Sequence, residues 1–153
     1  MKTAGNELHE IVATCKEQLK RITEADAAKK INPDKWSKKE ELGHLVDSAF
    51  NNHRRFIVAQ YEHHPKIVYD QNYWVQAGHY QQQPFATLVS LWEILNLQIC
   101  EVLESIPHES FEKTCNTGKD EIELHTIRWL ASDYVKHLLH HLHHILELEE
   151  IPY

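Results

Sequence analysis

The segment from Asp133 to Ile145, DYVKHLLHHLHHI, predicts a long amphipathic helix that is unusually rich in histidine. Five histidines fall within eight residues, and the apolar residues around them recur with the period of an α-helix. A seven-residue repeat along the segment places His137 and His141 on the same inward stripe as Tyr134. The sequence therefore predicts two histidines on the buried face of one helix.

The spacing of His137 and His141 suits a metal site. Residues four apart lie one above the other on a helix, so two imidazoles can reach one ion, as in the HExxH motif of zinc enzymes. His140 and His144 have the same spacing, but their stripe continues through Lys136, which is typical of a flank. We therefore favour His137 and His141 as ligands, with His140 and His144 at the rim. The alternative is a set of solvated or hydrogen-bonded histidines without an ion.

The composition indicates one globular domain over residues 1–153. The chain is 42% hydrophobic and 25% charged, and its 4 glycines and 5 prolines favour long helices over many short strands. The net charge of -7 argues against a nucleic-acid partner, because phosphate binding needs a basic surface.

The cysteines indicate a reducing compartment. Cys15, Cys100 and Cys115 are odd in number, far apart and outside any CxxC pair, which is typical of free thiols. The acid-containing N-terminal segment lacks the apolar core of a signal peptide, and no run approaches the roughly 18 apolar residues of a membrane span. We expect a cytoplasmic protein with no membrane partner.

Four segments with apolar residues at helical spacing predict an all-α protein, a four-helix bundle with long connections. Ser37 and Glu40 form a capping box at the start of the second segment, and Pro84 suits the first position of the third. The predicted helices span residues 5–28, 37–57, 84–106 and from 126 almost to the end.

The connection over residues 61–83 is long and rich in aromatic residues. A connection of this length is uncommon without a function. It either roofs a pocket or simply covers the core, and the sequence leaves both readings open. We expect a short helix over residues 71–77 within it, and a short extended piece over residues 121–124 in the later connection.

His44 lies at the edge of the buried face of the second predicted helix, next to Leu45. An edge position that faces a neighbouring helix is where a third ligand can approach a site on that helix. Taken alone, His44 is more typical of a hydrogen-bonded surface histidine.

Several segments, in this order and separation, resemble DinB-like proteins over most of the chain. The segments are WSKKEELGHLVDSA (36–49) with Asn52, Arg55 and Phe56 behind it, YDQNYW (69–74), Trp92 with Asn96, and DYVKHLLHH (133–141). The resemblance implies a four-helix bundle with a metal site formed by His44, His137 and His141. The family includes S-transferases that use low-molecular-weight thiols such as bacillithiol or mycothiol, and homodimers are common in it.

Together these features predict a divalent-metal-binding protein, a metal-dependent thiol S-transferase or hydrolase that acts on a small molecule. Zinc, nickel and ferrous iron all accept imidazole ligands. The candidates for holding substrate are Asn51, Arg55, Tyr73 and Trp74.

Other roles are less defined by the sequence. Asp133 is a candidate for orienting a ligand imidazole, although a surface acid is the simpler interpretation. No general base is evident, since Glu41 is expected to point outward. The alternative functions are a non-catalytic metal-binding or stress-related interaction module and a plain helical protein with incidental histidines.

Overall fold

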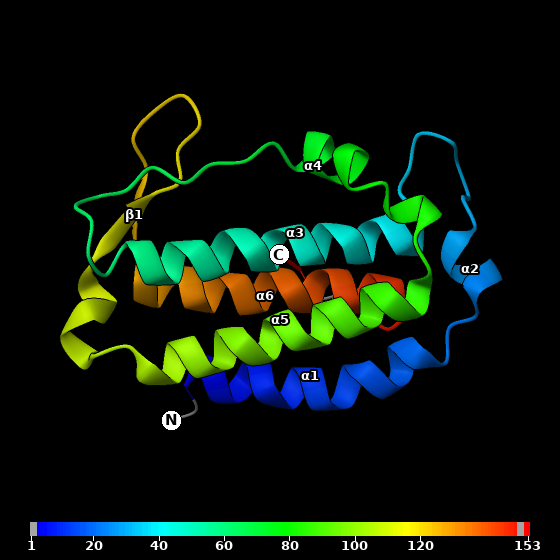
Figure 1. The fold of residues 1–153 in the computed structure, drawn as a ribbon, viewed down its shortest axis with the longest axis horizontal. Coiled ribbons are helices and arrows are strands. Elements are labelled where there is room, and N and C mark those ends of the chain that lie inside the picture. The colour runs from blue at the N-terminus through cyan, green and yellow to red at the C-terminus, as the bar shows by residue number, and fades with distance from the viewer. Residues whose placement is uncertain (1–2, 150–151) are drawn as a thin grey trace.

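Four long helices lie side by side in the computed structural model, which describes residues 3–149 and 152–153 (Figure 1). They are α1 (Ala4–Lys20), α3 (Lys38–Val58), α5 (Phe85–Ser105) and α6 (Ile127–Ile145). Helices α1 and α3 each pack against both α5 and α6. This closed arrangement confirms the predicted four-helix bundle.

The shorter elements lie in the connections and at the ends of the bundle (Figure 1). Strand β1 pairs with β2 in an antiparallel hairpin in which Cys115 lies opposite His125. These elements are α2 (Glu24–Ala28), α4 (Gln71–Gly78), the 3-10 helices η1 (Tyr80–Gln82) and η2 (His108–Glu112), β1 (Thr114–Asn116) and β2 (Leu124–Thr126). The short helix expected over residues 71–77 is therefore present as α4.

Side-chain caps start the helices that carry the histidines. The Ser37 hydroxyl accepts from the Glu40 backbone N–H at 3.2 Å, and the Glu40 carboxylate accepts from the Ser37 N–H, also at 3.2 Å. This is the predicted capping box of α3. Thr126 caps α6 by accepting from the Trp129 N–H at 3.1 Å. Both caps satisfy N–H groups that the first turn of a helix leaves without a partner.

Two predicted boundaries are wrong. The first helix was expected over residues 5–28 but ends at Lys20, because Thr23 accepts from the Asp26 N–H and starts the separate helix α2. The extended piece expected over residues 121–124 begins only at Leu124, where pairing with β1 starts.

The core fills the space between the four helices. It includes Leu8, Leu19, Leu42, Leu45, Phe56, Leu88, Trp92, Ile99, Ile127, Tyr134, Leu138 and Leu142. The Tyr134 hydroxyl donates to Asn96 at 2.5 Å, and the Asn96 amide donates to the Trp92 carbonyl, so the Asn96 side chain is paired within the core. The indole Nε1 of Trp92 is buried without a hydrogen-bond partner among the described residues. Cys15, Cys100 and Cys115 are buried free thiols.

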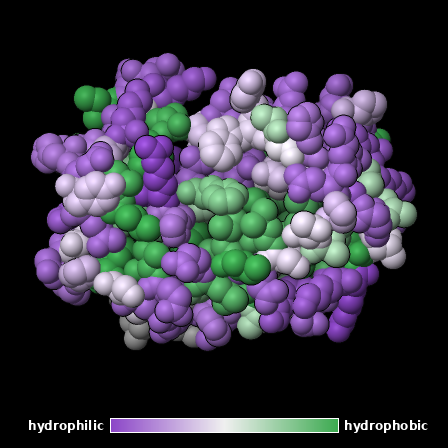
Figure 2. Space-filling model, in the orientation of Figure 1, coloured by the Kyte–Doolittle hydropathy of each residue, from purple (hydrophilic) through white to green (hydrophobic). Residues whose placement is uncertain are grey.

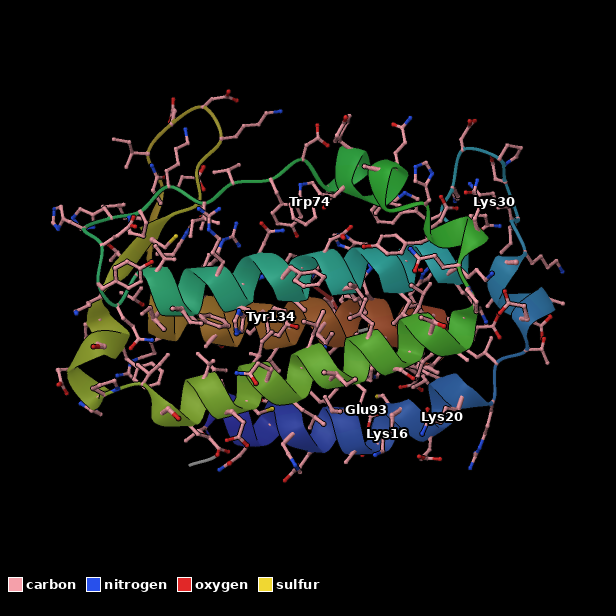
Figure 3. All side chains as sticks on the ribbon, viewed as in Figure 1. Lys16, Lys20, Lys30, Trp74, Glu93 and Tyr134 are labelled. Carbon is pink, nitrogen blue, oxygen red and sulfur yellow. The ribbon has the colours of Figure 1, made fainter. Side chains whose placement is uncertain are left out.

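The long connection runs along α3 and is attached to it by Tyr80. The Tyr80 ring lies against Gly43, where an added Cβ would be 2.0 Å from a ring carbon. The Tyr80 hydroxyl donates to the buried carboxylate of Asp47. Trp74 on α4 lies between α4 and α3 (Figure 3). The connection is therefore fixed to α3 beside His44.

Helix α5 is long and apolar enough to cross a membrane by length and composition, alone in this among the helices of the described part of the chain. In the structure it packs against α1 and α3, and Lys16 on α1 pairs with Glu93 on α5 at 2.9 Å (Figure 3). Figure 2 shows apolar side chains gathered in the middle of this face of the molecule, within a largely hydrophilic surround. Polar residues such as Asn96 occur within this helix, and its sequence therefore contains no long continuous run of apolar residues.

Candidate metal centre

Three histidines from two helices converge inside the bundle. His44 comes from α3, and His137 and His141 come from successive turns of α6. One ligand nitrogen from each lies within 4.8 Å of the other two, and the Nε2 atoms of His44 and His137 are 3.1 Å apart. The three ring centroids are 4.6–5.0 Å from one another. The structure thus brings together the three residues that the sequence singled out.

Burial keeps the imidazoles in the form that binds metals. Burial, with the charge of His141 added, lowers the pKa of His44 to about 4. Burial, with the charges of the neighbouring histidines added, lowers the pKa of His137 to about 3. Both rings are therefore neutral at physiological pH, with a lone pair available on one nitrogen of each.

Glu41 orients the third imidazole. Its carboxylate is buried one turn before His44 and accepts from Nδ1–H of His141 at 2.8 Å and from Nδ1–H of His144 at 2.7 Å. Burial alone would raise the pKa of Glu41, but the hydrogen bonds from His141 and His144 hold it below its usual value. Because Nδ1 of His141 is engaged by the carboxylate, Nε2 is the nitrogen that can face an ion, as in the carboxylate–histidine pairs of metal sites.

The donor set fits a divalent ion. With metal–nitrogen distances of about 2.0–2.1 Å, two ligands of a tetrahedral site lie ~3.3 Å apart, close to the 3.1 Å between His44 and His137. Without an ion these two nitrogens offer each other at most one hydrogen bond. Among the described residues, Nδ1 of His44 is buried without a hydrogen-bond partner. Three imidazole ligands leave coordination positions open, which is typical of catalytic sites.

A polar cavity of about 350 Å³ opens beside the histidines. Its lining includes His137 and His141 from α6, Arg55 from α3, and Tyr69 from the long connection. Tyr153 also lies there, with its ring 5.4 Å from that of His137 and its hydroxyl donating to Asp133 at 3.0 Å. The cavity is large enough for a small molecule next to His137 and His141.

The other candidates from the sequence lie in different places. Asn51 is buried and donates to the Asp47 carbonyl at 2.9 Å. Tyr73 and Trp74 line a separate depression, and their exposed fractions are 68% and 38%. Of the four residues predicted to hold substrate, Arg55 is the one that lines the cavity beside the histidines.

The alternative histidine pair lies toward the surface. His140 lines the cavity and is half-buried, whereas His144 is exposed and bonded to Glu41. The carboxylate next to a candidate ligand is therefore Glu41, and Asp133 instead accepts from Tyr153.

The expected outward orientation of Glu41 is wrong. Its inward direction was detectable from the sequence, because Glu41 precedes His44 by three residues and so shares its face of the helix. Ser48 and Asn52, which continue this stripe into the cavity, were identifiable in the same way. No sequence signal pointed to Tyr153, because its position depends on how the chain folds back after α6.

Comparison with known proteins places this architecture in a family. The model of the DinB superfamily matches residues 7–145. YfiT of Bacillus subtilis (strain 168), a probable metal-dependent hydrolase, is 25% identical over 142 residues, which make up 92% of this chain and 79% of YfiT.

Two solved structures share the fold. The structure of YfiT superposes on this chain with a TM-score of 0.84 at 23% identity. The superposed region covers 94% of this chain and 82% of the YfiT chain. A mycothiol-dependent maleylpyruvate isomerase superposes with a TM-score of 0.74 at 12% identity, over 99% of this chain and 65% of the isomerase. Since the family model spans all four bundle helices, this chain belongs to the DinB superfamily.

Proposed function

We propose that His44, His137 and His141 bind one divalent metal ion and that the protein is a metal-dependent enzyme acting on a small molecule. The observation that carries this proposal is the convergence of three imidazoles, two of them held neutral by burial, beside a cavity. Zinc, nickel and ferrous iron all suit the three nitrogens.

Some residues of the proposed site bind the ion, and others orient its ligands or border the cavity. The three histidines hold the ion, and Glu41 fixes the tautomer of His141. A divalent ion held by the three histidines would lower the pKa of a water or thiol and so would supply a nucleophile near neutral pH. The cavity beside it admits a small substrate, and the Tyr69 and Tyr153 rings border that cavity.

Two reactions share this chemistry, hydrolysis and thiol S-transfer. The name of YfiT favours a hydrolase, in which water is the nucleophile. An S-transferase would need a thiol from a second, low-molecular-weight substrate, because all three cysteines of this chain are buried. We place hydrolysis first, and S-transfer remains the second candidate.

The test uses protein purified without an affinity tag and loaded in turn with zinc, nickel and, without oxygen, ferrous iron. We expect about one ion per chain and turnover of a member of an ester, amide and thiol–electrophile panel. His137→Ala should abolish both, whereas His9→Ala, on the exposed face of α1, should change neither. Mass spectrometry of the product separates addition of water from addition of thiol.

The competing function is a non-catalytic metal-binding module. Stoichiometric binding by the three histidines with no metal-dependent turnover on the whole panel would support that module. Failure to bind any of the three ions would refute the proposed metal site, and only the helical scaffold would remain established.

A further inference from the structure

Arg55 places a cation in the same cavity as His137 and His141. Its guanidinium is half-buried and donates to the Ile67 carbonyl from Nε at 3.2 Å and from Nη2 at 2.9 Å. A weaker contact of 3.4 Å joins Nη1 to the Asn52 side-chain oxygen. A guanidinium carries five N–H groups, so at least two remain for another acceptor.

Arg55 forms no ion pair in the described part of the chain, although the charge of Asp133 and the face of the Tyr69 ring, 5.9 Å from the guanidinium carbon, both favour its charge. No carboxylate of residues 3–149 or 152–153 forms an ion pair with it, and its hydrogen-bond acceptors are neutral. Burial lowers the pKa of Arg55, which reflects the cost of keeping a charge there. Partly buried charges are ordinarily paired, so an anion in the cavity would offset this cost.

Asp133 is the one carboxylate among the described residues that line the cavity, and its charge favours that of Arg55 without an ion pair between them. Its two carboxylate oxygens accept from the Tyr153 hydroxyl at 3.0 Å each, which leaves the free N–H groups of Arg55 open to another acceptor. The lining contains no lysine and no second arginine among the described residues. Arg55 is therefore the permanent cation of this cavity.

Arg55 and the histidines lie at two ends of one helix face. His44, Ser48, Asn52 and Arg55 follow one another at spacings of three or four residues along α3. Eleven residues of helix rise about 16 Å, and the long side chain of Arg55 leans back toward the N-terminus of α3. A small molecule can thus contact Arg55 with one end and approach the histidines with the other.

We propose that Arg55 binds the carboxylate of the substrate, which makes the substrate a small carboxylic acid whose reacting group lies toward the three histidines. The identity of the anion as substrate rests on the proposed function, whereas the binding of a carboxylate by Arg55 does not. A planar carboxylate matches the fork of a guanidinium. A phosphate carries up to two negative charges, and one arginine beside Asp133 balances it poorly.

The test measures binding to metal-free protein from which the chelator has been removed, so that no ion competes for the probe. Butyrate, its neutral analogue butyramide, and ethyl phosphate are titrated while the Nε–Hε signal of Arg55 is followed by NMR. We expect butyrate to shift this signal saturably and more tightly than ethyl phosphate, and butyramide to leave it unchanged. Arg55→Gln should weaken butyrate binding by about tenfold or more.

Matched variants separate binding from folding. Arg54→Gln removes a neighbouring exposed charge and should leave butyrate binding unchanged. Arg55→Lys keeps the charge without the fork and should bind with intermediate affinity. If Arg55→Gln does not fold, the comparison of butyrate with butyramide on the native chain decides the question.

The outcomes are separable from those of the metal proposal. Equal binding of butyrate and butyramide, tighter binding of ethyl phosphate, or unchanged butyrate binding in a folded Arg55→Gln variant would overturn the assignment. Because the titration needs neither ion nor turnover, butyrate binding with no metal uptake would refute the enzyme proposal and leave the anion site standing.

Discussion

Glu41 connects two imidazoles through one carboxylate. It accepts from His141 inside the bundle and from His144, whose residue is exposed at the surface. The buried bond to His141 fixes which ring nitrogen faces the other two histidines. The carboxylate therefore acts on the centre without being one of the three proposed ligands.

Glu41→Gln should weaken metal binding by about 10–100-fold, the usual cost of losing an outer-shell partner of a histidine ligand. The amide keeps the size of the side chain but loses the charge that favours Nδ1–H on His141. Affinity is measured by competition with a chelator of known strength. Glu17→Gln, exposed on α1, is the control, and equal affinities in the two variants would contradict the role of Glu41.

Asp47 is a second buried carboxylate with a different energetic effect. It is 2% exposed, and its Oδ2 lacks a hydrogen-bond partner among the described residues. Burial raises its pKa from 3.8 to about 6, although the bond from Tyr80 opposes the rise. Between pH 4 and 6 the folded protein thus holds a proton that the unfolded chain has released. The contribution of Asp47 to the stability of the folded protein is therefore fully present below pH 4 and is lost as the pH rises through 6.

Asp47→Asn should therefore stabilise the protein increasingly as the pH rises. A shift of this size corresponds to about 3 kcal/mol, and the Tyr80 bond survives because an amide oxygen also accepts. Urea unfolding of both proteins from pH 4 to pH 8 gives the difference in unfolding free energy, in which contributions from other groups cancel. A difference that stays constant over this range would show that Asp47 titrates normally.

Among the elements, α3 carries the densest set of functional contacts. Its capping box fixes its start, Gly43 accepts the Tyr80 ring, and His44 follows directly. The contact at Gly43 leaves no room for a methyl group, so the long connection and the candidate metal centre depend on one residue. This explains why a glycine is found in a helix interior, where it ordinarily costs about 1 kcal/mol relative to alanine.

Gly43→Ala should destabilise the protein by about 1–3 kcal/mol, because the steric clash with Tyr80 outweighs the gain in helix propensity. Gly5→Ala in α1 is the matched control, since its Cβ would lie 3.4 Å from the nearest atom, Cγ of the Glu104 side chain. That control should be neutral or stabilising in urea unfolding. On a Tyr80→Ala background the penalty at Gly43 should vanish, and its persistence would locate the strain elsewhere.

At the scale of the whole molecule, the proposed ion would connect α3 to α6. Ligands from two helices bind only in the folded state, so binding adds RT ln(1 + [ion]/Kd) to stability, about 2.7 kcal/mol at a hundredfold excess over Kd.

Removal of the ion should accordingly lower the thermal midpoint by several degrees. Calorimetry with and without added zinc measures the change, and His137→Ala should eliminate it. His9→Ala should retain it. Equal shifts in both variants would indicate that zinc binds outside the cluster.

The sequence contains enough to predict the bundle and the convergence of His44, His137 and His141, because both follow from helical periodicity and a family resemblance. It does not fix the break after Lys20, which depends on the local hydrogen bond of Thr23. Nor does it separate Arg55 from Tyr73 and Trp74, since the side of α3 on which the connection lies is a tertiary property.

The reactivity of the three buried thiols can report where the folded protein opens transiently. Cys100 is buried on the long helix α5, where burial raises its pKa to about 11, while Cys115 belongs to a two-stranded hairpin at the periphery. Small hairpins separate from a fold at lower cost than central helices. An alkylating reagent under native conditions should therefore modify Cys115 before Cys100, and peptide mass spectrometry over time would order the two openings without any introduced label.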